Sequence, residues 1–133
     1  MTFANHAVTL ELLKTLLQAQ EGLEFAVLVG SQANGTANAQ SDWDLALRWH
    51  KDISAMDQLM LSEQLKQTIH RELGVHPDQL DLIDMAHAKL AMRALVAEEG
   101  VVLAGQDTLP WLNFLTLTWA ELEDFHWRKT HAA

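Results

Sequence analysis

Two aspartates separated by a single residue, Asp42 and Asp44, are the strongest chemical feature of the sequence. They lie at the start of a run of alternating apolar residues, 43–49, that is typical of a strand, and side chains two apart on a strand point to the same face. Carboxylates this close repel each other and resist joint ionisation unless a cation lies between them. Oxygen ligands of this kind suit Mg²⁺, which commonly takes one or two carboxylates together with substrate phosphates. The pair therefore predicts a metal site.

A third carboxylate, Asp81, lies in the strand-like segment 80–83, Leu-Asp-Leu-Ile. A lone Asp inside a buried strand is costly unless it is paired or ligates a metal. If this strand lies beside the strand 43–49, Asp81 joins Asp42 and Asp44. Three carboxylates can hold two metals ~3.5–4 Å apart, which clamp the attacking and leaving oxygens of an in-line displacement. Phosphoryl or nucleotidyl transfer needs mainly this positioning and charge neutralisation.

Gly30 and Ser31 precede the aspartate pair, with ten residues between Ser31 and Asp42. Gly30 ends a strand predicted over 23–29, at a point where the backbone must turn and approach another group closely, which Gly does without steric cost. Ser31 then starts a short helix, whose free N–H groups and hydroxyl suit an anionic phosphate. On their own the two residues indicate only a strand end. Their distance from the aspartate pair makes them candidates for phosphate binding.

The elements that must position these residues follow from hydrophobic periodicity and end signals. Asp84, three residues beyond Asp81, is expected on the opposite face as a surface or capping residue. We expect helices at 8–20, 54–73 (with Ser54 as N-cap and Gly74 as the stop), 86–99 and 110–128, and strands at 23–29, 43–49, 79–83 and, briefly, 101–103. This order predicts one α/β or α+β domain over residues 1–133. Its catalytic core spans about 23–105 and its C-terminal helix about 110–129.

Length and composition exclude several classes of protein. A chain of 133 residues fits one domain and buries enough surface for a core without staples. The absence of Cys excludes disulfide scaffolds, zinc ribbons and thiol nucleophiles. The formal net charge of −9 argues against a protein that grips nucleic acid through its phosphates. The sequence shows no targeting or membrane segment, so we expect a cytoplasmic protein without direct nucleic-acid or membrane contacts.

Taken together, these motifs resemble the DNA polymerase beta-like nucleotidyltransferase superfamily. Gly30-Ser31, the ten-residue spacer and Asp42-x-Asp44 match its signature, and the strand of Asp81 matches its later strand with the third catalytic Asp. Residues 97–105 match its helix-to-strand ending. The resemblance covers roughly 23–105 and is closest to the minimal nucleotidyltransferase (MNT) branch, many of whose members are antitoxins paired with HEPN-domain toxins. Many relatives carry Arg or Lys in the spacer, whereas this chain has neither, so metal, backbone N–H groups and a residue elsewhere must meet the phosphate charge.

The resemblance implies a small mixed β-sheet flanked by helices, the nucleotidyltransferase fold, and a Mg-dependent transfer of AMP from ATP. In that reading Asp42 and Asp44 ligate two Mg²⁺ ions. Asp81 completes the second metal site and helps to deprotonate the acceptor hydroxyl. Gly30 and Ser31 hold the triphosphate.

The motifs do not specify which molecule accepts the AMP. About 28 residues follow Gly105, too few for a substrate domain, so we expect a protein partner to present the acceptor. In the family that partner is a HEPN toxin, an all-helical RNase in which a tyrosine hydroxyl receives AMP. The leading hypothesis is therefore an antitoxin that silences its HEPN toxin by AMPylation. Two alternatives remain: an enzyme for a small hydroxylated acceptor such as an aminoglycoside, and a non-catalytic antitoxin that acts by binding alone.

Overall fold

The computed structural model of the chain describes residues 6–38 and 41–132. The described elements follow in the order α1 (His6–Gln18), β1 (Leu23–Val29), α2 (Ser31–Asn34), β2 (Trp43–Trp49), α3 (Ala55–Leu73), a 3₁₀ turn η1 (Pro77–Gln79), β3 (Leu80–Asp84), α4 (Leu90–Glu99), β4 (Val101–Ala104) and α5 (Leu109–His131). The predicted alternation of helices and strands is confirmed, and β1 and β2 have the predicted bounds. Residues 39 and 40, inside the ten-residue spacer, lie outside the described residues, as do the ends of the predicted domain.

The four strands form one mixed sheet in the order β3-β2-β1-β4. Strand β1 pairs antiparallel with both β2 and β4, whereas β2 and β3 run parallel. The parallel pair is joined by a crossover that contains α3, as a parallel connection requires. The predicted α/β fold with a small mixed sheet flanked by helices is thus confirmed.

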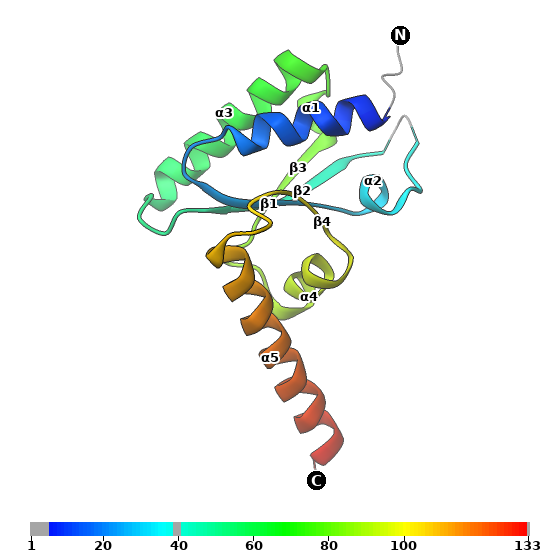
Figure 1. The fold of residues 1–133 in the computed structure, drawn as a ribbon, viewed down its shortest axis with the longest axis vertical. Helices are drawn as coiled ribbons and strands as arrows, with labels where there is room; N and C mark the ends of the chain where they lie inside the picture. The colour runs from blue at the N-terminus through cyan, green and yellow to red at the C-terminus, as the bar shows by residue number, and fades with distance from the viewer. Residues whose placement is uncertain (1–5, 39–40, 133) are drawn as a thin grey trace.

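Helices cover both faces of the sheet (Figure 1). Helices α1 and α3 pack on one face, where Leu13, Leu65 and Ile69 meet Leu45 and the other inward residues of the sheet. Helices α4 and α5 pack on the opposite face over a second apolar cluster: Phe25, Val27, Val29, Ala46, Met85, Val96, Trp111 and Phe114. The strict alternation along β1 and β2 explains why the central strands contribute to both clusters. Burial on both faces fixes the register of these strands, since a slip by one residue would exchange the two clusters.

Helix α3 has the predicted end signals. The Ser54 hydroxyl accepts a hydrogen bond from the Asp57 backbone N–H at 3.1 Å, and Gly74 ends the helix in the left-handed conformation with a φ of 76°. Helix α4, in contrast, begins at Leu90 and not at the predicted residue 86. The Asp84 carboxylate accepts a hydrogen bond from the Ala86 N–H at 2.9 Å and contacts the His87 ring at 2.7 Å. This local turn competes with the first helical turn and delays the helix.

Helix α5 starts with Pro110 in its first turn, as predicted, and its C-terminal half extends away from the sheet and its covering helices (Figure 1). An ion pair between Arg93 of α4 and Glu121 links the two helices. Beyond Leu122 every described residue of α5 is exposed. Among the described helices, none has both the length and the apolar character that crossing a membrane would require.

Candidate active site

Gly30 is the point at which the end of β1 meets the aspartate pair. Its φ of +76° lies in the left-handed region that disfavours residues with a side chain. A Cβ built on Gly30 would lie only 2.5 Å from Asp44 Oδ2. The close approach predicted for this glycine is therefore present, and the group it approaches is the Asp44 carboxylate. In the β1–β2 ladder Asp44 lies opposite Val29, so Asp44 Oδ2 fills the space where a side chain of residue 30 would be.

The short helix α2 and the spacer that follows it are held by a small set of hydrogen bonds. The Gln32 side chain is buried, and its Nε2 donates to the Ser41 carbonyl at 3.3 Å. The Ser41 hydroxyl accepts from the Asn38 N–H at 2.9 Å. Gln32, which directly follows Ser31 in α2, is thus hydrogen-bonded to Ser41, the residue before Asp42.

The role of Gln32 was not predicted from the sequence. A glutamine in a polar segment of small residues looks like a solvated side chain. Its burial results from the way α2 folds back over the start of β2, and no local sequence signal indicates this contact.

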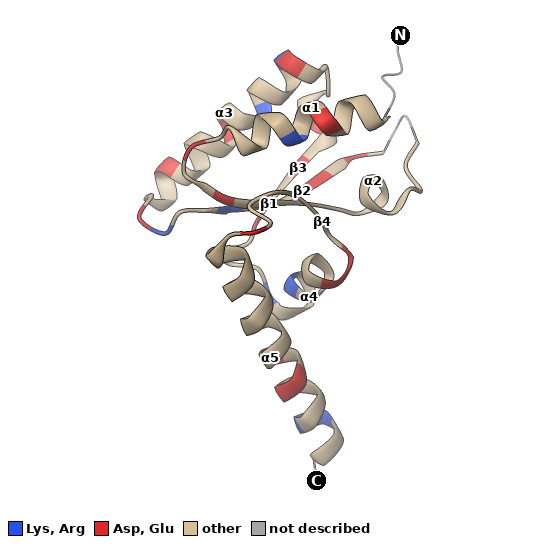
Figure 2. Ribbon diagram, viewed as in Figure 1, with Lys and Arg blue, Asp and Glu red and all other residues tan. Residues whose placement is uncertain are grey.

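The three predicted carboxylates lie near the start of the parallel pair β2–β3. Asp44 and Asp81 are direct register partners on these strands, and Asp42 immediately precedes β2. Asp44 is partly buried, whereas Asp42 and Asp81 are exposed. Figure 2 shows the acidic residues of β2 and β3 next to each other in the sheet.

The surroundings of Asp44 raise the pKa of its carboxyl group. Burial, which penalises the charged carboxylate, is the largest cause that raises the pKa of Asp44 above its ordinary value of 3.8; the charges of Asp81 and then Asp42 raise the pKa further. Within the described residues, no three His, Asp or Glu side chains lie close enough together to form a ready metal-binding group. The three carboxylates therefore offer oxygen ligands of the kind that a divalent cation takes, but as the described side chains lie they do not form a metal-binding group.

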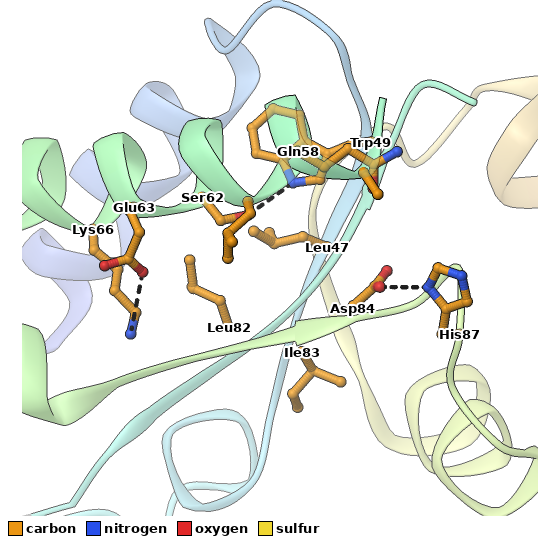
Figure 3. Close-up of a pocket in the computed structure, with 12 residues that line it drawn as sticks. Leu47, Trp49, Gln58, Ser62, Glu63, Lys66, Leu82, Ile83, Asp84 and His87 are labelled. Carbon is orange, nitrogen blue, oxygen red and sulfur yellow. Dashed lines mark hydrogen bonds and ion pairs between the residues drawn. The ribbon is translucent and has the colours of Figure 1, made fainter. Parts of the chain in front are cut away.

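The cavity in Figure 3 is a separate feature. It measures about 310 Å³ and lies between α3 and the strands β2 and β3. Leu47 and Leu82 line it, and both side chains point to the α3 face of the sheet. Asp44 and Asp81 alternate with such residues and point to the opposite face. The cavity and the carboxylate cluster thus lie on the two sides of the same pair of strands.

A comparison with protein families shows which family the chain belongs to. The model of the family described as polymerase beta, nucleotidyltransferase, matches residues 11–109 of the chain, which include Gly30, Ser31 and all three aspartates. The chain belongs to the polymerase beta nucleotidyltransferase family. The resemblance found in the motifs is thereby confirmed at the level of the family.

A curated relative of this nucleotidyltransferase also matches in sequence. A protein adenylyltransferase, MntA, from Aphanizomenon flos-aquae (strain 2012/KM1/D3) is 27% identical over 96 residues, which are 70% of this chain and 64% of the relative. The chain thus matches less than two thirds of the length of that relative.

Solved structures share the fold. A crystal structure of a toxin–antitoxin with AMP-PNP matches with a TM-score of 0.65 and 21% identity, over 95% of this chain and 94% of the other. The structure of a tri-AMPylated HEPN toxin from Shewanella oneidensis in complex with its MNT antitoxin matches with a TM-score of 0.62 and 18% identity, over 94% and 93% of the two chains. At these identities the similarity establishes the nucleotidyltransferase fold.

Proposed function

We propose that this nucleotidyltransferase is an antitoxin that transfers AMP from ATP to a tyrosine of a cognate HEPN RNase toxin and so neutralises it. The observation that carries the proposal is the meeting of Asp42, Asp44 and Asp81 beside Gly30 within a family fold. The 27% identity to a protein adenylyltransferase and the shared fold with an MNT antitoxin bound to an AMPylated HEPN toxin support the choice of acceptor.

Magnesium fits the residues that are present. The cluster offers carboxylate oxygens only, which are hard ligands of the kind that Mg²⁺ prefers. Burial and then the charges of Asp81 and Asp42 raise the pKa of Asp44, and a cation bound at this site would offset all three effects. We propose that Asp42 and Asp44 hold two Mg²⁺ ions with Asp81 as a ligand of the second. The ions supply neutralisation of the triphosphate charge, which the Lys- and Arg-free spacer does not provide.

The protein residues then have distinct roles in the transfer. Gly30 and Ser31 bind the triphosphate through backbone N–H groups and the Ser31 hydroxyl. Asp81, the exposed carboxylate on β3, accepts the proton of the acceptor hydroxyl. The acceptor oxygen forms a bond to the α-phosphorus of ATP while the bond from that phosphorus to the bridging oxygen breaks. Pyrophosphate leaves with the electron pair of the broken bond, and the acceptor carries AMP.

The proposed cellular setting follows from the proposed reaction. A HEPN RNase acts on cellular RNA, so an antitoxin that silences it works in the cytoplasm. The chain itself needs no contact with nucleic acid or membrane for this role.

Intact mass spectrometry tests the proposal directly. The purified protein is mixed with ATP, Mg²⁺ and the HEPN-domain protein encoded beside its gene, and we expect the partner to gain one or more AMP units. Asp44→Asn abolishes this gain. Asp52→Asn, which removes an exposed carboxylate beyond the other end of β2, leaves it unchanged. No mass gain with the wild-type protein contradicts the transferase function for that partner.

A second measurement separates catalysis from binding alone. We expect the wild-type protein at normal expression levels to protect cells that express the toxin, and the proposed mechanism requires that Asp44→Asn loses this protection. If the Asp44→Asn protein protects cells as well as the wild type, neutralisation occurs by occlusion.

A further inference from the structure

Helix α5 has an exposed apolar side along most of its length. Trp111, Phe114 and Thr118 are buried, so their side of the helix packs on the rest of the domain. Residues three or four positions apart share one side of a helix. The opposite side carries four large apolar residues that are between 42% and 69% exposed: Leu109, Leu112, Trp119 and Trp127. Within the described structure, no other element covers this side of α5.

One carboxylate, that of Glu123, lies within this apolar side. Trp119 is four residues before Glu123 and Trp127 is four residues after it, so the three side chains occupy successive turns on one side of α5. The Trp127 ring stacks on the ring of His131 at 4.2 Å, a contact within the helix that still leaves Trp127 61% exposed. We call the set of Trp119, Glu123 and Trp127 the Trp-Glu-Trp face.

Glu123 differs from the neighbouring carboxylates of α5 in its charge environment. Glu121 forms an ion pair with Arg93, and the Asp124 carboxylate lies 3.0 Å from Arg128 Nε. Among the residues that the structure describes, none forms an ion pair with Glu123. The Trp-Glu-Trp face therefore combines two exposed indoles with a carboxylate that has room for a cation from another molecule.

This combination fits an arginine side chain. A guanidinium is attracted to the face of an indole, and its planar fork can also donate two parallel hydrogen bonds to a carboxylate. Trp119 and Trp127 lie one turn on either side of Glu123, within reach of a group that binds this carboxylate. A second copy of this chain does not supply that group, because residues 109–127 of α5 contain no Lys or Arg. Charge complementarity thus favours a different protein.

Helix α5 also lies on the side of the sheet to which the candidate catalytic carboxylates point. Asp44 and Asp81 alternate with Leu45 and Leu82, which pack on the α3 side, so their side chains point to the side that α4 and α5 cover. A protein bound to α5, which extends away from the sheet in Figure 1, thus lies on the same side of the sheet as the carboxylate cluster.

We propose that the Trp-Glu-Trp face is the docking surface for a helix of the acceptor protein, with an arginine of that helix bound to Glu123 between the two indoles; the proposal rests on the protein-AMPylating function above. Two helices pack side by side through residues spaced three and four apart, which is the spacing on α5. A helix also agrees with the all-helical character of the proposed acceptor. Docking here holds the acceptor without taking part in the chemistry, so it lowers the acceptor concentration that transfer requires.

Two substitutions on the Trp-Glu-Trp face test the docking, each with a matched control. Trp127→Ala is compared with Phe125→Ala, which removes an aromatic residue that is 51% exposed on a different side of the same helix. Glu123→Lys is compared with Glu11→Lys, which makes the same change of charge on α1, at the opposite face of the sheet. All four residues are exposed, so the substitutions leave the core intact.

Affinity for the HEPN-domain protein is measured by calorimetry without ATP, so that the result does not depend on catalysis. We expect Trp127→Ala to bind at least about 30-fold more weakly than the wild type, which is the size of a hot-spot truncation. We expect about tenfold weaker binding for Glu123→Lys and wild-type affinity for both controls. In the transfer assay, Trp127→Ala needs more acceptor but reaches the wild-type rate at saturation.

Equal affinities of Trp127→Ala and Phe125→Ala for the HEPN-domain protein overturn the docking surface, as does a wild-type protein that does not bind this partner. Sedimentation of the chain alone covers the remaining occupant: a dimer that dissociates with Trp127→Ala also overturns the proposal, because a second copy then covers the face. If the wild-type protein binds the partner through this face but transfers no AMP, the protein-AMPylating function has failed and the docking surface stands. The two failures are thus distinguishable.

Discussion

Substitution of Gly30 by alanine tests whether the close approach of β1 positions the Asp44 carboxylate. The new Cβ would lie 2.5 Å from Asp44 Oδ2, about 0.9 Å short of the 3.4 Å of an ordinary contact. The neighbour is a carboxylate with little free space, so we expect Asp44 to be displaced by about 1 Å. A misplacement of about 1 Å in a reacting group can cost about 100-fold in rate.

Gly30→Ala also introduces backbone strain, which a control must separate from the displacement. Gly74 has the same φ of +76°, ends α3, and has no atom within 4 Å of the position that a Cβ would occupy. Alanine costs about 1–2 kcal/mol in the left-handed conformation of Gly74, whose ψ is 8°, and about 1–3 kcal/mol in the conformation of Gly30, whose ψ is −157°. Gly74→Ala therefore introduces an alanine at the same positive φ, with strain of comparable size, but without the displacement of Asp44.

The assay combines urea unfolding with the rate of AMP transfer to the HEPN-domain protein. We expect both variants to lose about 1–3 kcal/mol of stability, and Gly30→Ala alone to lose about 100-fold in transfer rate. Binding of ATP with Mg²⁺ weakens in parallel for Gly30→Ala. If Gly30→Ala retains the transfer rate of Gly74→Ala, the glycine does not position Asp44 and the reasoning is refuted.

Three further predictions concern single side chains. Because the pKa of Asp44 is raised, the folded protein holds this proton more tightly than the unfolded chain, and the resulting stability is present at low pH and lost as the pH rises through the raised pKa. Asp44→Asn should therefore be more stable than the metal-free wild type at pH 7 in urea unfolding, with the gap closing as the pH falls below the raised pKa of Asp44; a variant that is less stable at pH 7 contradicts this. Gln32→Ala removes the hydrogen bond to the Ser41 carbonyl and should weaken binding of ATP with Mg²⁺ about three- to tenfold in calorimetry, whereas the exposed Gln67→Ala should not; equal affinities would disprove a positioning role. Thr118 is fully buried and its hydroxyl has no hydrogen-bond partner in the described structure, so Thr118→Val should raise the free energy of unfolding by about 1 kcal/mol, and a decrease would indicate an overlooked partner.

Much of the site could be predicted because its signals are local. Gly30, Ser31, Asp42 and Asp44 lie within about fifteen residues of sequence. A strand, a tight turn and a second antiparallel strand bring such residues together by short-range geometry alone. The alternation along β2 correctly predicted that Asp44 and Leu45 lie on opposite faces. The start of α4 was predicted wrongly because the Asp84 side chain stabilises a turn that helix propensity does not report.

The sequence by itself determined the residue types of the site, their spacing and the strands that carry them. Tertiary structure alone decided that β3 pairs in parallel with β2, which sets Asp81 beside Asp44 and leaves the outer edge of β3 open. It also decided that Gln32 is buried and that a groove lies under α3 on the other side of the same strand. The physical reason is that strand pairing and burial depend on contacts between segments far apart in the chain. Such contacts are selected by the packing of the whole sheet, and no local pattern encodes them.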